Sequence, residues 1–346
     1  MTEKPDLKSM NQTELLSFVK EAGEKPFRAG QLYQWMHQKL SASIDEMTNL
    51  PAGFRAKLKQ ECIFSALKQT DVQISRQDGT RKYLFLLEDQ NMIESVWMRY
   101  KFGGSVCISS QAGCRMGCKF CASGLNGLAR NLSPAEMLEQ VYRIQRDIGE
   151  RISHVVVMGT GEPLDNYDNL LKFIELITAE EGLHISQRNL TVSTCGIVPN
   201  IRKLAEKRLG ITLAVSLHAS SQEKRETLMP IAVKYKLEEL MHTCRYYFEK
   251  TGRRITFEYA LASGVNDTEK DARSLAELLF GMNCHVNLIP INPVKEQIYR
   301  GSGQDAALAF KNKLEKNGIN VTIRREMGRD IDAACGQLRK RYVEGR

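Results

Sequence analysis

Three cysteines lie close together in the stretch SSQAGCRMGCKFCASG, at positions 114, 118 and 121. Their C-x3-C-x2-C spacing puts three thiols within eight residues of a glycine-rich loop. Cysteine thiolates are the usual ligands of iron–sulfur clusters, and a [4Fe–4S] cluster normally takes four of them. Cys114, Cys118 and Cys121 therefore predict a [4Fe–4S] cluster with one iron open to a ligand from outside the protein.

Two other interpretations of these cysteines are open at this point. A structural zinc site needs a fourth Cys or His at close spacing, usually as paired C-x2-C elements, and the sequence has no second pair. Three buried free thiols are also compatible with the composition, although the glycine-rich loop favours a metal. A zinc-stabilised RNA-binding protein is the non-enzymatic alternative.

A second glycine-rich turn, Gly159-Thr160-Gly161-Glu162-Pro163, follows a run of valines. Glycines allow a ligand to approach the backbone closely, which is typical of cofactor-binding turns. A tight turn between a strand and a helix needs the same glycines without any ligand. The spacing alone leaves both interpretations open.

These motifs belong to a region that alternates between short β-branched runs and longer helical patterns, which is typical of parallel strands with crossover helices. A helix over Ser133–Ile148 is predicted by a capping box of Ser133 and Glu136 with Pro134 between them. We expect a partial parallel (β/α) barrel with its ligands at the carboxyl ends of the strands. The predicted strands are Val106–Ser109, His154–Met158, Asn189–Ser193, Thr212–Leu217, Ile255–Leu261, His285–Ile291 and Val321–Arg324.

The chain divides by pattern into three parts. Residues 1–68 have helical apolar spacing and predict a small helical module that could contact RNA. Residues 69–99 alternate around Asp78-Gly79, a favoured hairpin turn, and predict a β-hairpin and a further strand. Residues 100–346 form the predicted barrel and a C-terminal segment that carries Cys335.

The composition is that of a folded globular protein, with 346 residues, 42% hydrophobic and 26% charged. It excludes intrinsic disorder, collagen and coiled coil. No signal peptide or membrane-spanning run is found, so we expect a cytoplasmic protein without a membrane partner. In such a reducing compartment the nine cysteines are not expected to form structural disulfides, so some of them need a metal or a chemical role. The net charge of +8 would attract a polyanion without specifying its sequence.

Several motifs together resemble one enzyme family. The C-x3-C-x2-C motif with an aromatic residue, Phe120, before its last cysteine is similar to the radical S-adenosylmethionine superfamily. The stretches VVVMGTGEPLDNYDN, VSTCGIVP, SLHAS, INP and GRDIDAACGQL, and KPFRAGQLYQWMHQ near the N-terminus, resemble its RlmN/Cfr family of RNA adenine methyltransferases. The resemblance keeps the order and spacing of the motifs over nearly the whole chain.

The resemblance implies which residues hold the cofactors. They are a [4Fe–4S] cluster on the three cysteines and S-adenosylmethionine, two molecules of which are used per turnover. Taken alone, Ser, His and Asn at strand ends are more typical of caps and turns. The implied S-adenosylmethionine contacts are Gly161, Glu162, Ser193, Ser216, Leu217, His218 and Asn292.

The resemblance also implies a catalytic set outside the cysteine motif. Cys335 is methylated on sulfur and delivers that methyl carbon, Cys107 resolves the intermediate through a transient disulfide, and Glu94 accepts a proton. From the residues alone, Cys107 on a β-branched strand is typical of a buried side chain, and Glu94 beside a hairpin is typical of a solvated charge. The other cysteines, assigned to packing, are Cys62, Cys195, Cys244 and Cys284.

The implied substrate is an adenine in the peptidyl-transferase centre of 23S rRNA, methylated at C2, and also the adenine 3′ of some tRNA anticodons. Methylation at C8 of the same rRNA adenine, as in the Cfr branch, is the alternative, and Pro163 after Glu162 favours the C2 branch. Another radical class would not need Cys107 and Cys335. We expect a monomer that depends on an external electron donor.

Overall fold

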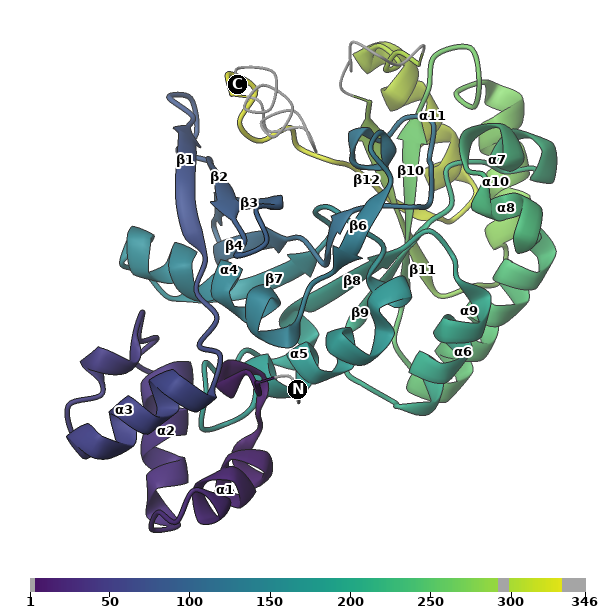
Figure 1. The fold of residues 1–346 in the computed structure, drawn as a ribbon. Coiled ribbons are helices and arrows are strands. Elements are labelled where there is room, and N and C mark those ends of the chain that lie inside the picture. The colour runs from purple at the N-terminus through teal and green to yellow at the C-terminus, as the bar shows by residue number, and fades with distance from the viewer. Residues whose placement is uncertain (1–3, 292–298, 332–346) are drawn as a thin grey trace.

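The computed structural model describes residues 4–291 and 299–331, and one curved ten-stranded sheet organises them (Figure 1). The order of the strands in the sheet follows the chain, apart from a small ribbon described below. The strands are β1 (Lys68–Ile74), β2 (Arg81–Leu86), β3 (Met92–Tyr100), β4 (Gly103–Ile108), β7 (Ile152–Val157), β8 (Leu190–Thr194), β9 (Thr212–Ser216), β10 (Ile255–Leu261), β11 (Cys284–Pro290) and β12 (Asn320–Ile323).

The sheet changes direction at β4. Strands β1 to β4 pair antiparallel, whereas β4 and β7 to β12 pair parallel. All seven strands predicted for the barrel are present, within two residues of their predicted starts except β4, which begins at Gly103. The outward-facing residues of β7, Val155 and Val157, are fully or almost fully buried, which explains their β-branched character. The predicted partial barrel is confirmed, and β1 to β3 extend its sheet.

Helices cover the outer side of the curved sheet (Figure 1). The first of them begins as predicted, because Ser133 and Glu136 form a complete capping box with Pro134 at the first helical position. These helices are α4 (Pro134–Ile148), α5 (Tyr167–Thr178), α6 (Val198–Glu206), α7 (Gln222–Leu228), α8 (Ile231–Lys234), α9 (Leu237–Thr251), α10 (Glu269–Leu279) and α11 (Gln304–Lys316).

A helical module precedes the sheet. It contains α1 (Gln12–Glu21), α2 (Phe27–His37) and α3 (Ala52–Glu61). The module packs on α4 through a buried ion pair in which Lys8 Nζ lies 2.7 Å from Glu139 Oε1. His37 Nδ1 also lies 2.7 Å from the hydroxyl of Tyr142. These contacts are buried, so the module forms part of the same folded body as α4.

The chain after β12 returns to the far end of the sheet. We call residues 324–331 the return segment. The carboxylate of Asp330 accepts hydrogen bonds from Ser75 Oγ and Arg76 N, and the Gly328 N–H donates to Asp78 Oδ2 at 2.9 Å. The return segment therefore spans from β12 to the turn between β1 and β2 (Figure 1).

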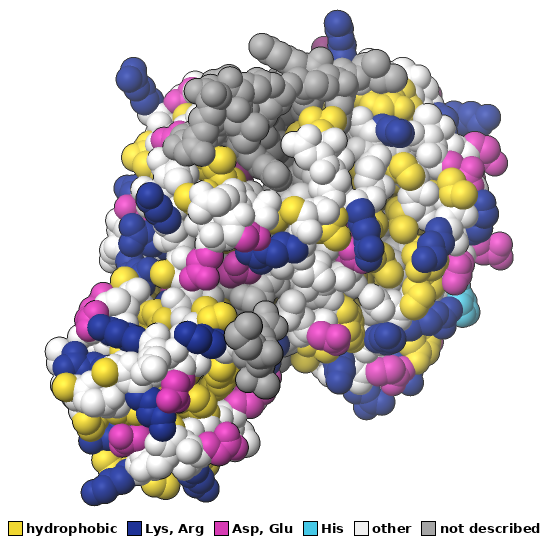
Figure 2. Space-filling model, viewed as in Figure 1, with side chains coloured by type: hydrophobic (Ala, Val, Ile, Leu, Met, Phe, Trp, Pro, Cys, Tyr) yellow, Lys and Arg dark blue, Asp and Glu magenta, His cyan; other side chains and the backbone are white. Residues whose placement is uncertain are grey.

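The surface shown in Figure 2 mixes charges of both signs. Lysine and arginine side chains are spread over the helical module and the barrel and are interspersed with acidic ones. Among the described residues, no helix is long and apolar enough to cross a membrane.

Candidate active site

The predicted metal-binding cysteines lie on a tightly closed loop, residues 114–127, which we call the cysteine loop. An antiparallel ribbon of β5 (Gln111–Gly113) and β6 (Leu128–Asn131), which the sequence did not predict, holds its two ends together. The Cys114 N–H donates to the Gly127 carbonyl oxygen at 2.8 Å. A Cβ on Gly113 would lie 2.1 Å from that same oxygen, so no other residue fits at this position.

The three thiols of the loop lie close enough to influence one another's pKa values. Burial raises the pKa of Cys114 to about 11, against a backbone hydrogen bond from Met116 and with a smaller contribution in the same direction from the thiol of Cys121. Burial also raises the pKa of Cys118, with added contributions from Cys121 and Cys114. In the part of the chain that the structure describes, no three His, Cys, Asp or Glu side chains converge as ligands of a metal ion.

The donor set nevertheless fits an iron–sulfur cluster. Each cysteine that holds a [4Fe–4S] cluster binds a different iron, so the sulfurs stand farther apart than the ligands of one ion. Three neighbouring thiols on one glycine-rich loop meet this requirement. Cys114, Cys118 and Cys121 would hold the cluster and leave one iron accessible.

The glycine turn after β7 packs against protein backbone. A Cβ on Gly159 would lie 2.8 Å from the carbonyl carbon and oxygen of Ile108, and one on Gly161 would lie 2.6 Å from Gln111 Cβ. Gly161 also has a φ of +109°, which L side chains rarely adopt. The close packing of this turn alone explains both glycines.

Glu162, in the same turn, is buried and fully engaged by the protein. Its Oε1 accepts from Leu164 N at 2.9 Å, which caps η4 (Pro163–Asn166), and its Oε2 accepts from Cys195 N at 2.7 Å. Burial raises the pKa of this carboxyl, against the effect of these hydrogen bonds. The side chain thus ties the end of β7 to the end of β8.

The other predicted cofactor contacts lie at the same edge of the sheet. Ser193 is the second-last residue of β8, and Ser216 ends β9 on the neighbouring strand; both are half-buried. Leu217 is fully buried. His218 has a φ of +55°, and its ring contacts the ring of Phe120 in the cysteine loop with centroids 4.6 Å apart.

His218 is held as a neutral base. Its Nδ1 accepts a hydrogen bond from Ala260 N at 2.9 Å. Burial, together with the nearby charge of Arg225, lowers the pKa of His218 to about 3. The cysteine loop therefore packs on an uncharged imidazole. Asn292 lies outside the described residues.

Glu94 and Cys107 lie on the inner face of the sheet. Cys107 pairs directly with Val96 of β3, so Glu94, two residues earlier, is its diagonal neighbour on the same face, about 7–8 Å away. Glu94 is buried, with the Lys82 ammonium 3.5 Å from its Oε2, and is not the solvated charge expected from the residue alone. Cys107 is half-buried.

The thiol of Cys107 has charged neighbours. Burial raises its pKa and Glu94 adds to this, while Arg324 and Lys82 oppose it. Cys335, the other cysteine for which the resemblance implies a catalytic role, lies outside the described residues. The cysteines assigned to packing are all buried as expected, namely Cys62, Cys195, Cys244 and Cys284.

Two further buried charges at this edge were not predicted. Glu258 of β10 pairs with Ser216 in register, and its Oε2 accepts from Asn287 Nδ2 at 2.9 Å. Arg225 of α7 is fully buried and donates to the carbonyl oxygens of Cys195 and Ser216. The stretch SQEKRETL around Arg225 has the charge pattern of a solvated helix, so the sequence gives no signal of its burial.

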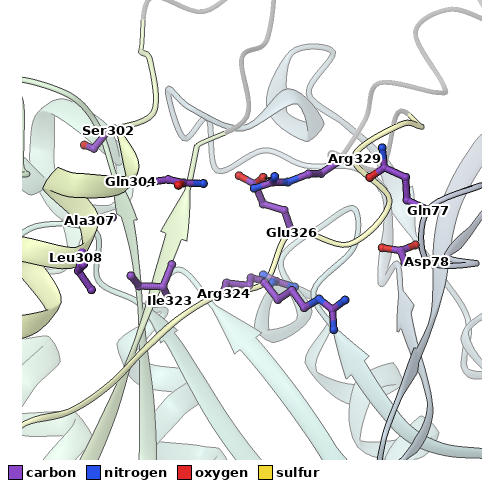
Figure 3. A pocket seen from close by; sticks show the side chains of 11 residues that line it. Gln77, Asp78, Ser302, Gln304, Ala307, Leu308, Ile323, Arg324, Glu326 and Arg329 are labelled. Carbon is purple, nitrogen blue, oxygen red and sulfur yellow. Dashed lines mark ion pairs between the residues drawn. The ribbon is translucent and has the colours of Figure 1, made fainter.

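A cavity of about 740 Å³ opens beside the return segment, between the β1–β2 turn and α11 (Figure 3). Arg324, Arg325 and Arg329 line one side, with Asp78 and Glu326. None of the predicted cofactor residues that the structure describes lines this cavity. Arg329 forms an ion pair with Glu326, so Arg324 and Arg325 are the guanidinium groups that would suit an anionic ligand such as a phosphate.

Comparison with known proteins identifies the family. Residues 108–276 match the radical SAM superfamily, and residues 5–64 match the ribosomal RNA large subunit methyltransferase N-terminal domain. A protein of Lachnospira eligens described as "probable dual-specificity RNA methyltransferase RlmN" is 63% identical over 98% of this chain and 97% of its own. One of Lachnoclostridium phytofermentans with the same description is 57% identical over 99% of this chain and 97% of its own.

A solved structure agrees. The crystal structure of a radical SAM methyltransferase from Sphaerobacter thermophilus superposes with a TM-score of 0.93 at 39% identity, covering 96% of this chain and 98% of the other. Membership implies S-adenosylmethionine and a [4Fe–4S] cluster as cofactors. On these grounds the chain belongs to the RlmN family of radical SAM RNA methyltransferases.

Proposed function

We propose that this enzyme methylates C2 of an adenine in the peptidyl-transferase centre of 23S rRNA and of the adenine 3′ of the anticodon in some tRNAs. The observation that carries the proposal is the full-length similarity to relatives described as dual-specificity RlmN enzymes. A monomer in the cytoplasm, supplied by an external electron donor, fits these substrates.

The chemistry of the target carbon explains why such a site is needed. C2 of adenine is an electrophilic aromatic carbon, so it does not attack a methyl sulfonium as an amine would. When bound, the cluster and two molecules of S-adenosylmethionine per turnover would supply the methyl group and the one-electron chemistry for a radical route. Cys114, Cys118 and Cys121 would hold the cluster, and the residues at the ends of β7, β8 and β9, with Asn292, would hold S-adenosylmethionine.

The chain's own residues would carry the carbon to the base and release it. The sulfur of Cys335 would hold the methyl carbon, which would lose one hydrogen atom in the one-electron chemistry that the cofactors supply and would then bond to C2. As Glu94 accepts the C2 proton, one electron would return to the cofactors, which leaves a neutral thioether between Cys335 and the adenine. The Cys107 thiolate would then attack the Cys335 sulfur, so that an S–S bond forms as the S–C bond breaks, and the released carbon would take up a proton to become the methyl group. An external two-electron reductant restores the two thiols.

The inner face of the sheet supports these roles. Glu94 is a buried carboxylate beside the Lys82 ammonium, on the diagonal next to Cys107. A proton acceptor and a resolving thiol thus share one face. The arginines of the cavity beside the return segment would receive phosphates of an RNA whose target base has left its stack.

The test is mass spectrometry of nucleosides after anaerobic incubation of the cluster-loaded enzyme with S-adenosylmethionine, a reductant and unmodified 23S rRNA or tRNA. We expect 2-methyladenosine from the wild type and none from Cys335→Ala. Cys284→Ala, a buried cysteine with no assigned role, is the matched control and should retain activity. A product at C8, no product, or product from Cys335→Ala would contradict the proposal.

A further inference from the structure

Arg225 is a fully buried cation that forms no ion pair with a carboxylate in the part of the chain that the structure describes. Its Nη2 donates to the carbonyl oxygens of Cys195 at 2.7 Å and Ser216 at 3.3 Å. Its Nε and Nη1 are buried and have no hydrogen-bond partner among the described residues. A guanidinium cannot lose its proton in a protein, so this charge has to be compensated by something that binds beside it.

The surroundings of Arg225 are thiols. The thiols of Cys195, Cys118 and Cys244 lie within electrostatic range of it. Cys118 and Cys195 also pack together in one buried cluster with Leu228, the last residue of α7. Arg225 therefore lies next to one of the three cysteines that would hold the iron–sulfur cluster.

The cysteine loop and α7 are joined directly. The Lys119 N–H donates to the carbonyl oxygen of Leu228 at 2.9 Å, one residue after Cys118. Gly196 gives room for the guanidinium, because a Cβ there would lie 3.2 Å from Arg225 Nη2. The unpaired face of the guanidinium is thus held in a fixed place relative to the loop.

We propose that Arg225 is the counter-charge of the iron–sulfur cluster and raises its reduction potential. The inference rests on the proposed function, since it needs the cluster to be bound by Cys114, Cys118 and Cys121. Three thiolates bring more negative charge than the oxidised core neutralises, and reduction adds one electron more. A fixed cation in a buried site stabilises the more negative, reduced form, and net charge is one of the main controls of cluster potential.

The carboxylate of S-adenosylmethionine is the alternative to the iron–sulfur cluster as the anion that pairs with Arg225. The contacts favour the iron–sulfur cluster, because Cys118, which would be one of its ligands, lies within electrostatic range of Arg225 and packs against Cys195 and Leu228. The cysteine loop is also hydrogen-bonded to α7. The two sources are separated by measuring the cluster in the absence of S-adenosylmethionine.

The experiment is a potentiometric titration of the reconstituted holoenzyme, followed by electron paramagnetic resonance without S-adenosylmethionine. Arg225→Gln retains a donor for the Cys195 carbonyl but removes the charge, and Arg225→Lys retains the charge. At the midpoint potential of the wild type, we expect the ratio of reduced to oxidised cluster to fall about tenfold in Arg225→Gln, a shift of about 59 mV to more negative potential for one electron. Arg225→Lys should keep the midpoint potential close to that of the wild type.

A matched control is Arg273→Gln, which removes an exposed arginine of α10 that pairs with Glu269. It should titrate like the wild type. Cys244→Asp places a carboxylate beside Arg225 and neutralises it without removing it, so it tests the same shift if Arg225→Gln does not fold. The same downward shift is expected.

An unchanged potential in a cluster-loaded Arg225→Gln or Cys244→Asp variant would overturn the inference while leaving the proposed function intact. So would an unchanged potential together with weaker binding of S-adenosylmethionine, since Arg225 would then serve the cofactor. A wild-type chain that binds no cluster would overturn the proposed function and this inference together.

Discussion

Gly161→Ala tests whether the glycine turn after β7 is required by packing or by a ligand. The new Cβ would lie 2.6 Å from Gln111 Cβ and 2.8 Å from Gln111 N, so the backbone of β5 would have to move. Overpacking of this kind costs about 1–3 kcal/mol. An alanine at a φ of +109° adds about 1–3 kcal/mol of backbone strain.

We therefore expect the free energy of unfolding to fall by about 4 kcal/mol, the middle of the summed range. At roughly 2 °C per kcal/mol for a chain of this size, the melting temperature would fall by about 8 °C. The assay is urea and thermal unfolding of the protein without metal or cofactor, so that ligand binding does not contribute to the measured stability.

Gly149→Ala is the matched control. Gly149 ends α4 with a φ of +66°, and nothing lies within 4 Å of its added Cβ, so only strain of about 1–2 kcal/mol remains. If Gly161→Ala lost no more stability than Gly149→Ala but lost S-adenosylmethionine binding, the glycine would be needed for the ligand, and the packing argument would be refuted.

Three further outcomes follow from buried groups and helix propensity. Gly30→Ala, at an exposed position of α2 with open space around the added Cβ, should raise the free energy of unfolding by about 0.5–1 kcal/mol in urea titrations. Lys8→Ala leaves Arg146, at 3.4 Å, as the one cation paired with the Glu139 carboxylate among the described residues, so we expect the free energy of unfolding to fall by about 3 kcal/mol and proteolysis of the helical module to become faster. Burial lowers the pKa of His37 to about 3 from 6.5, so the folded state binds fewer protons than the unfolded state below pH 6.5. His37 should then contribute a loss of stability of about 1.4 kcal/mol per pH unit as the pH drops from 6.5 toward 3, and His37→Gln should reduce the total slope by that amount in urea titrations across this range.

The strands of the barrel are predictable because their signal is local. Val155 and Val157 alternate with half-buried residues and pack under helices, and such a run has few other conformations that bury it. The start of α4 is equally local, since the capping box of Ser133 and Glu136 needs only three residues of spacing. Neither element depends on which other segments lie beside it.

The neighbours of Glu94 depend on pairing between strands and were not predictable in the same way. Glu94 faces the barrel interior only because β3 pairs with β4 in the register Val96 to Cys107. A shift of one residue would turn Glu94 to the opposite face of the sheet. The ribbon of β5 and β6 is a similar case, since the run Gln111-Ala112-Gly113 has no β-branched residue and is a strand because it pairs with Leu128–Asn131.

Arg225 shows a third kind of limit. Its helix, α7, is short and rich in charges, and burial of one charge among them depends on the ends of β8 and β9 lying directly beside it. The hydrophobic periodicity of a helix predicts which of its faces is buried. An arginine in that pattern predicts a solvent-exposed position, so the pattern places Arg225 on the wrong side of α7. Groups of this kind become visible only once the strand ends are placed.

The antiparallel strands β1 to β3 extend the parallel sheet beside β4 and contribute to the candidate active site. A parallel sheet alone would leave β4 as its edge, whereas β3 pairs with that edge and places Glu94 diagonal to Cys107 on the inner face. The turn between β1 and β2 also holds the return segment through Ser75 and Asp330. Cys335 follows Asp330 by five residues, which span at most about 18 Å when extended. The three strands thus supply a carboxylate to the inner face, from β3, and anchor the chain that leads to Cys335, the cysteine proposed to carry the methyl group, at the β1–β2 turn.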